Sequence, residues 1–167
     1  MNFRHRYRDV PTPHVAEWTS VSRLAERIDA WRDLARRAAE PNPFYEPEYL
    51  MAGAELRGRD IRCVAVYRDG SRDSDLIGLF PVQRGRVWDG AILPALELFR
   101  NDYTCLTTPL IDAASPQAVW ASFLDCVAHA PSRPHTVIGR LMPAGRPVFA
   151  ALVEVLAERR LASIELE

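Results

Sequence analysis

The first third of the chain alternates apolar and charged positions with the period of an α-helix. A helix is predicted to begin at Ser20 or Ser22, since both are good N-caps, and apolar residues then recur at helical spacing. A short strand over residues 14–19 precedes this helix, and a second, shorter helix is predicted from Pro47 to about Leu56. The apolar face of the first helix is formed by Val21, Leu24, Ile28, Trp31 and Ala35.

Residues 40–50 separate these two helices, and prolines alternate there with aromatic and acidic residues. Each proline fixes its own φ and disfavours the helical conformation of the residue before it. The first helix should therefore stop near the start of this segment, and Pro47 can open the next. The result is a rigid corner that presents Phe44, Tyr45 and Glu46. It either closes a hydrophobic core as an aromatic plug or lines a ligand cleft.

Two apolar runs in the middle of the chain predict an antiparallel hairpin. Residues 61–68 have a continuous apolar centre, which favours a strand covered on both faces, and residues 76–84 return after a polar turn. Pro81 cannot donate to a ladder, so a bulge or a sheet edge is predicted there. Beyond this hairpin we expect a turn at 89–90 and strand pieces at 96–99 and 105–107.

The last third of the chain predicts helix, strand, helix and strand. Ser115 caps a helix with Pro116 at its first position, and Pro131 and Pro134 stop it. A strand over 136–141, a helix opened by Pro147 and a final strand over 162–166 follow. Because the chain ends inside this last predicted strand, we expect it to be a piece of a longer protein. The apolar face of the first of these helices is formed by Val119, Trp120, Phe123 and Val127.

This order of elements predicts an α/β fold in which helices flank a mixed, mainly antiparallel sheet. With 167 residues the chain is one domain by size. Residues 1–13 form a flexible N-terminal arm and residues 14–167 form the domain. The arm interleaves Arg with aromatic residues, so it could touch RNA or lipid headgroups or remain a solvated tail.

Composition excludes several classes of function. The net charge is -1, which gives no general field for nucleic acid or anionic membranes, and all 21 basic residues are Arg, which excludes a lysine nucleophile. The three cysteines are widely spaced and indicate neither a disulfide framework nor a zinc site. Neither a secretory signal nor an apolar run long enough to cross a membrane is present in the sequence, so we expect a cytoplasmic location.

Three segments carry a resemblance to a known superfamily, together with the order of the elements. They are residues 38–50 (AAEPNPFYEPEYL), 76–82 (LIGLFPV) and 101–112 (NDYTCLTTPLID). From about Trp18 onward the chain resembles the GNAT superfamily of N-acyltransferases. Within it, the three segments are similar to the CelD/BcsL-type acetyltransferases, which are linked to cellulose or exopolysaccharide biosynthesis and resemble FemAB proteins in carrying two GNAT-like halves in tandem. The resemblance implies acyl-CoA as cofactor and an amine or hydroxyl acceptor, such as that of a small molecule or a saccharide.

The chain departs from the family at the cofactor loop. GNAT enzymes hold the CoA pyrophosphate on a Gln/Arg-x-x-Gly-x-Gly/Ala loop whose backbone N–H groups open a helix. None of the glycines in this chain has Gln or Arg three residues before it. The first half of tandem GNAT proteins typically lacks this loop. The resemblance therefore implies an N-terminal half that is inactive alone, with a second GNAT-like half, or another copy of the chain, as partner.

Acyl transfer needs a base and hydrogen-bond donors that face the developing oxyanion. The densest polar cluster lies at residues 100–104, where Asp102 could be the base, as could Glu46 of the corner, while Tyr103 could position the acceptor. The same cluster could instead be a turn in which Asn101 and Asp102 bond to their own backbone. The predicted acceptor-binding residues are Phe44, Tyr45, Arg100, Asn101, Tyr103 and Thr104.

Other candidates have simpler explanations. Cys105 with His129 or His135 could form a thiol nucleophile, but a buried cysteine in a strand also explains it. Arg146, before the helix opened by Pro147, could bind phosphate or belong to a plain turn. The histidines show no metal-ligand spacing, and no metal is expected. Two other functions also stay open: a non-catalytic domain that recognises a saccharide or peptide, and a complete small GNAT enzyme with an atypical CoA loop.

Overall fold

The computed structural model describes residues 14–57, 60–69, 75–88, 91–130, 134 and 136–165, without the side chains of 86–88 and 91–94. The elements are β1 (Val15–Ser20), α1 (Val21–Ala25), α2 (Ile28–Arg37), the 3-10 turn η1 (Pro43–Tyr45), α3 (Pro47–Leu56), β2 (Arg62–Tyr67), β3 (Leu76–Trp88), β4 (Ala91–Leu98), β5 (Leu110–Ile111), α4 (Pro116–Ala128), β6 (Thr136–Ile138) and α5 (Pro147–Glu158). The predicted arm, the turns at 70–74 and 89–90, Pro131 and His135 lie outside the described residues.

Prolines open helices α3, α4 and α5. Pro47, Pro116 and Pro147 each stand in the first turn of their helix, where a missing N–H breaks no hydrogen bond. All three starts agree with the prediction from sequence. The segment predicted as one helix from Ser20 or Ser22 is instead two helices. Backbone bonds from Glu26 and Arg27 to carbonyls three residues earlier tighten the chain between α1 and α2.

A six-stranded sheet forms the centre of the fold. Its strand order is β1-β2-β3-β4-β6, and β5 pairs with β3 beside this path. All neighbouring pairs are antiparallel except β4 and β6, which run parallel. The chain is therefore a mixed, mostly antiparallel α/β fold, as the sequence predicts.

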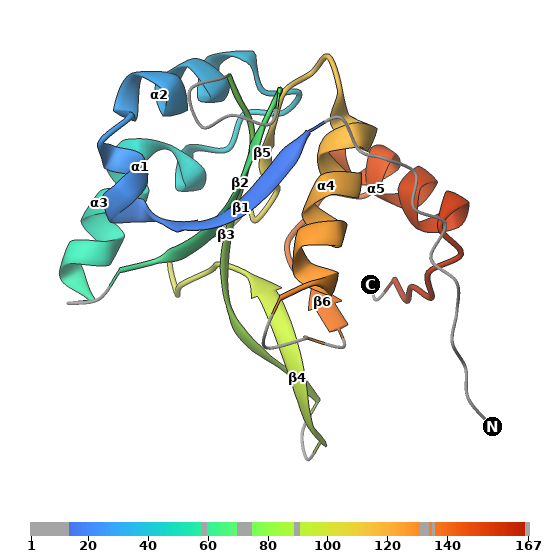
Figure 1. Ribbon diagram of the computed structural model, residues 1–167. Helices are drawn as coiled ribbons and strands as arrows, with labels where there is room; N and C mark the ends of the chain where they lie inside the picture. Colours follow the sequence, from blue (N-terminus) through green and yellow to red (C-terminus); the bar gives the residue numbers. More distant parts are fainter. Residues whose placement is uncertain are drawn as a thin grey trace.

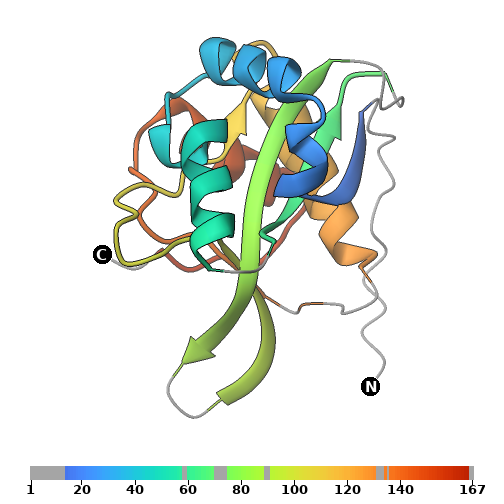
Figure 2. The ribbon, with the colours of Figure 1, turned by 90° about the vertical axis from the view of Figure 1, so that its left-hand side faces the viewer.

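Helices cover both faces of this sheet (Figure 1). Helices α1, α2 and α3 lie on one side, and α4 and α5 lie on the other; Figure 2 looks onto the first group, with the far ends of β3 and β4 extending beyond it. Along β2, Cys63 and Ala65 pack into the core under α1–α3, while Val64 and Val66 pack into the core under α4 and α5. The prediction that this strand is covered on both faces is confirmed.

Pro81 is at neither a bulge nor an outer edge, so that prediction is wrong. It pairs with Cys63 inside β3, and its carbonyl accepts a hydrogen bond from the Phe99 N–H at 2.8 Å. In an antiparallel strand, the backbone nitrogen and carbonyl of one residue point toward the same neighbouring strand. The nitrogen of Pro81 therefore faces β4 and β5 rather than β2. Pairing with β5 ends at Leu79 and pairing with β4 begins at Val82. The proline falls in the gap between them, where no ladder bond is lost.

Two predicted strands are absent from the described chain. Residues 105–107 form a loop, because Thr107 bonds through its N–H to the carbonyl of Leu141 and through its hydroxyl to that of Arg140. The same contacts end β6 at Ile138, short of the predicted 141. Residues 161–165 are mainly exposed and lie in no strand.

Candidate functional site

The proline-rich corner is held by buried hydrogen bonds. Asn42 is fully buried; its Oδ1 accepts from the N–H of Phe44 and its Nδ2 donates to the carbonyl of Thr108 at 2.7 Å. Tyr45 is also fully buried, and its hydroxyl donates to the carbonyl of Phe99 at 2.8 Å. The Trp31 indole donates to the carbonyl of Tyr45 at 3.0 Å. The corner is therefore an aromatic plug in the core, the first of the two interpretations above.

The polar turn at 100–104 is organised by Asn101. Its Oδ1 accepts from the N–H of Tyr103 at 2.9 Å and from the hydroxyl of Thr104 at 3.0 Å. It also accepts from the Tyr49 hydroxyl of α3 at 3.0 Å. The self-bonded turn considered above is thus present for Asn101. The bond from Tyr49 joins this turn to the segment that begins at the proline corner.

The two candidate bases differ in their surroundings. Asp102 and Tyr103 project from the turn into solvent, and Tyr103 is 81% exposed. Glu46 is half-buried, and its backbone carbonyl accepts from the N–H of Leu50 at the start of α3. The structure brings the corner and the turn together through Tyr45 and Tyr49. The carboxylates of Asp102 and Glu46 have no hydrogen-bond or ion-pair partner among the described residues.

A buried carboxylate beside this turn was missed by the sequence analysis. Glu97 on β4 is 7% exposed, and its Oε1 accepts from Nε of Arg100 and from Nε of Arg140, each at 3.0 Å. Gln83 on β3 lies 3.5 Å from its other oxygen. In the sequence, Glu97 could have been noticed as an acidic residue between Leu96 and Leu98, which face the core, in an otherwise apolar strand.

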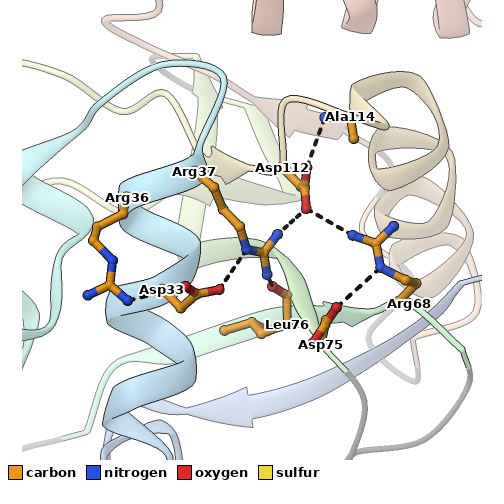
Figure 3. Close-up of polar contacts among 8 residues, drawn as sticks. All are labelled: Asp33, Arg36, Arg37, Arg68, Asp75, Leu76, Asp112 and Ala114. Atoms are coloured by element: carbon orange, nitrogen blue, oxygen red, sulfur yellow. Dashed lines mark hydrogen bonds and ion pairs between the residues drawn. The ribbon is translucent and has the colours of Figure 1, made fainter.

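Asp112 is the centre of a second charged cluster, which Figure 3 shows. Its Oδ2 accepts from Arg37 of α2 and from Arg68, which follows β2, while its Oδ1 accepts from the N–H of Ala114 at 2.8 Å. Arg37 also bonds to Asp33 at 2.8 Å. Asp112 is the last residue of the third segment that carries the family resemblance. Its partners show that it holds the layer of α2 to the sheet.

Helix α5 also begins against a carboxylate. The buried Glu40 accepts a hydrogen bond of 2.7 Å from the N–H of Val148, in the first turn of this helix. A carboxylate at this end is favoured by the helix dipole, and it takes a donor that a phosphate would use. One donor of the possible phosphate site beside Arg146 is therefore already used by Glu40.

Cys105 and His129 share no hydrogen bond in the described part of the chain, and His135 lies outside it. Cys105 is exposed and lies in a loop, so the simpler expectation of a buried cysteine in a strand is also wrong. His129 bonds through Nδ1 to the carbonyl of Asp125, one turn earlier in α4. Burial raises the pKa of the Cys63 thiol far above its ordinary value, which keeps it protonated. No group of three or more metal-ligating side chains occurs within the described ranges.

Two hollows lie away from the corner and the turn. One of about 250 Å³ is bordered by β1 and α4, and one of about 410 Å³ by α1 and α3. Neither is lined by the predicted acceptor-binding residues.

Comparison with protein-family models found no match, and neither curated proteins nor solved structures gave one. In the described part of the chain, no helix has the length and apolar character needed to cross a bilayer.

Proposed function

We propose that this chain is the N-terminal GNAT-like half of an acetyltransferase of the CelD/BcsL type. In this proposal, an acyl group passes from acyl-CoA to an amine or hydroxyl acceptor in cellulose or exopolysaccharide biosynthesis. The chain supplies the acceptor side of the site and is inactive alone. The order of its strands and helices, on which the resemblance partly rests, supports this assignment.

One observation carries the proposal. Residues from two of the segments that resemble the family meet at the end of β4, where Tyr45 bonds to the carbonyl of Phe99 and Tyr49 bonds to Asn101. These bonds bury the base of the corner and leave Asp102 and Tyr103 exposed at the surface. Such a platform of a base and a phenol suits a second domain that delivers the acyl group.

Two backbone N–H groups near the starts of α4 and α5 are not free for the CoA pyrophosphate. Anion binding at a helix start needs free backbone N–H groups. The N–H of Val148 in α5 is bonded to Glu40, and the N–H of Ala114 before α4 is bonded to Asp112. Both carboxylates would repel a pyrophosphate. We therefore place the acyl-CoA site on the partner half, and no step on this chain uses the cofactor.

Within this proposal, Asp102 or Glu46 removes the proton of the acceptor, and Tyr103 orients the acceptor by a hydrogen bond. A positioned base contributes about 10²–10⁴-fold to rate. The acceptor surface further comprises Phe44, Tyr45, Arg100, Asn101 and Thr104. Tyr45 and Thr104 act there only through the shape of the corner and the turn, because both are buried.

Acetyl transfer to saccharide acceptors tests the proposal in this chain and in a longer product of the same gene, where one exists. We expect transfer by the longer product alone, and a loss of about 10²-fold or more in kcat for its Asp102→Asn or Glu46→Gln variant. Transfer by the 167-residue chain alone would contradict the half-enzyme proposal. Absence of transfer in both would favour the non-catalytic binding domain.

A further inference from the structure

Arg100 and Arg140 converge on one atom although they are far apart in sequence. Arg100 follows β4 and Arg140 follows β6, and the Nε of each lies 3.0 Å from Oε1 of Glu97. Strands β4 and β6 are parallel neighbours, so both arginines stand at the carboxyl ends of adjacent parallel strands. Crevices at such ends are frequent ligand sites in α/β sheets.

The charges in this cluster are not balanced. Two guanidinium groups face one carboxylate, which leaves one net positive charge. Glu97 is buried, whereas the side chains of Arg100 and Arg140 are 45% and 48% exposed. Within the described part of the chain, the terminal nitrogens of both arginines have no hydrogen-bond acceptor. These donors are therefore available to a ligand from solvent.

The loop that contains Thr107 fixes the backbone of Arg140. Thr107 donates through its hydroxyl to the carbonyl of Arg140 and through its N–H to that of Leu141. Leu141 has a φ of 55°, a left-handed conformation that costs a non-glycine residue free energy. Such a conformation persists where the surrounding structure imposes it. Here it turns the backbone directly after Arg140.

We propose that Arg100 and Arg140 bind the oxyanion group of a small molecule, either a phosphate or a carboxylate. Glu97 is the positioning residue that holds the two like charges together without saturating them. The planar donor edges of guanidinium groups match both kinds of oxyanion. This inference rests on the cluster itself and requires no acyl transfer, although Arg100 also belongs to the proposed acceptor surface.

The test follows the side-chain Nε–H signals of the 167-residue chain by ¹⁵N NMR during titration with inorganic phosphate or acetate. Chloride at matched ionic strength corrects for screening. We expect saturable shifts of the Arg100 and Arg140 signals. A response to phosphate alone assigns a phosphate ligand, and a response to acetate assigns a carboxylate.

Variants then distinguish a site from a general salt effect, because phosphate also stabilises proteins by exclusion from their surface. Arg100→Gln and Arg140→Gln should each weaken binding by about tenfold or more, and the double variant should abolish it. Arg84→Gln is the matched control, since Arg84 pairs with Leu96 and its side chain leaves the opposite face of the sheet. Unshifted Nε signals in the unsubstituted chain would overturn the proposal. Equal shifts of the backbone N–H signal of Glu97 in the chain and in its double variant would overturn it as well.

Discussion

The Tyr45 hydroxyl donates a 2.8 Å hydrogen bond to the carbonyl of Phe99, and this bond ties the proline corner to the end of β4. The two residues are 54 positions apart, and both are buried. Phe99 stands between the end of β4 and the polar turn that begins at Arg100. The corner therefore fixes the position of the turn through the core.

Replacing Tyr45 by Phe should remove this bond while keeping the ring. The buried carbonyl of Phe99 loses its donor, so we expect about 1–2 kcal/mol less free energy of unfolding near neutral pH. Urea denaturation measures the difference. A fully stable variant would show that the corner is held by ring packing alone.

The same variant should change the alkaline response. Burial, with the charges of Cys63 and Glu97 adding to it, raises the pKa of Tyr45 well above its ordinary 10.0. The folded-state pKa thus exceeds the unfolded one, so the stabilisation is complete below pH 10 and is lost as pH rises above it. The stability gap between the chain and Tyr45→Phe should narrow above pH 10. A gap that is constant across this range would contradict the assignment.

Asp112→Asn should destabilise the fold much more than Asp33→Asn. The first change leaves Arg37 and Arg68 without their buried partner, at a cost of about 2–4 kcal/mol. Asp33 is half exposed, so its loss should cost below about 1 kcal/mol. Paired thermal denaturation measures both variants, and equal losses would contradict the role given to Asp112.

The comparison of Asp112→Asn with Asp33→Asn has a second readout, which is the change of folding stability at acid pH. Hydrogen bonds from Arg37 and Arg36 hold the pKa of Asp33 below its ordinary 3.8. Its small contribution is therefore present above about pH 4 and is lost as pH falls further. Asp33→Asn should remove that share of the acid-induced loss of stability.

Gly78→Ala tests how closely β3 approaches α4. A Cβ at Gly78 would stand 2.4 Å from Cγ1 of Val119, so overpacking should cost about 1–3 kcal/mol. Val119→Ala in the same chain should recover part of this loss. Gly53→Ala in α3 is the control: its nearest contact is 3.8 Å away, and removing a helical glycine should stabilise by about 0.5–1 kcal/mol. Destabilisation of similar size at both glycines would contradict the packing described.

Glu40→Ala should destabilise more than Glu40→Gln. Alanine leaves the buried N–H of Val148 without an acceptor, which costs about 1–3 kcal/mol, whereas glutamine keeps an acceptor and loses only the charge. Chemical denaturation of the two variants measures the difference. An equal loss would show that the charge, rather than the hydrogen bond, holds the start of α5.

The sequence predicted those features of the fold that are set by residues close together along the chain. Pro47, Pro116 and Pro147 set the starts of their helices, and the continuous apolar centre of β2 indicated helices on both faces. These features need no knowledge of distant contacts. The coarse α/β architecture could therefore be predicted from the sequence.

Contacts between distant segments could not be predicted in this way. Thr107 lies in a loop because it bonds to Arg140 and Leu141, more than 30 positions away. In the sequence, Glu97 is only one polar residue in a strand, because its contact with Arg140 depends on the fold. The turn at 100–104 was located from its polar residues, but its link to Tyr49 depends on α3.

A thermal-shift titration of the 167-residue chain with acetyl-CoA tests the proposed half-enzyme most directly. The same concentrations of inorganic phosphate are run in parallel, because the cluster at Glu97 could bind the phosphates of CoA. A ligand that binds the folded state raises the midpoint as its concentration passes Kd. We predict no shift beyond that of phosphate for this chain, and a saturable shift for a longer product of the gene. A saturable shift of the 167-residue chain with acetyl-CoA, larger than that with phosphate, would contradict the account.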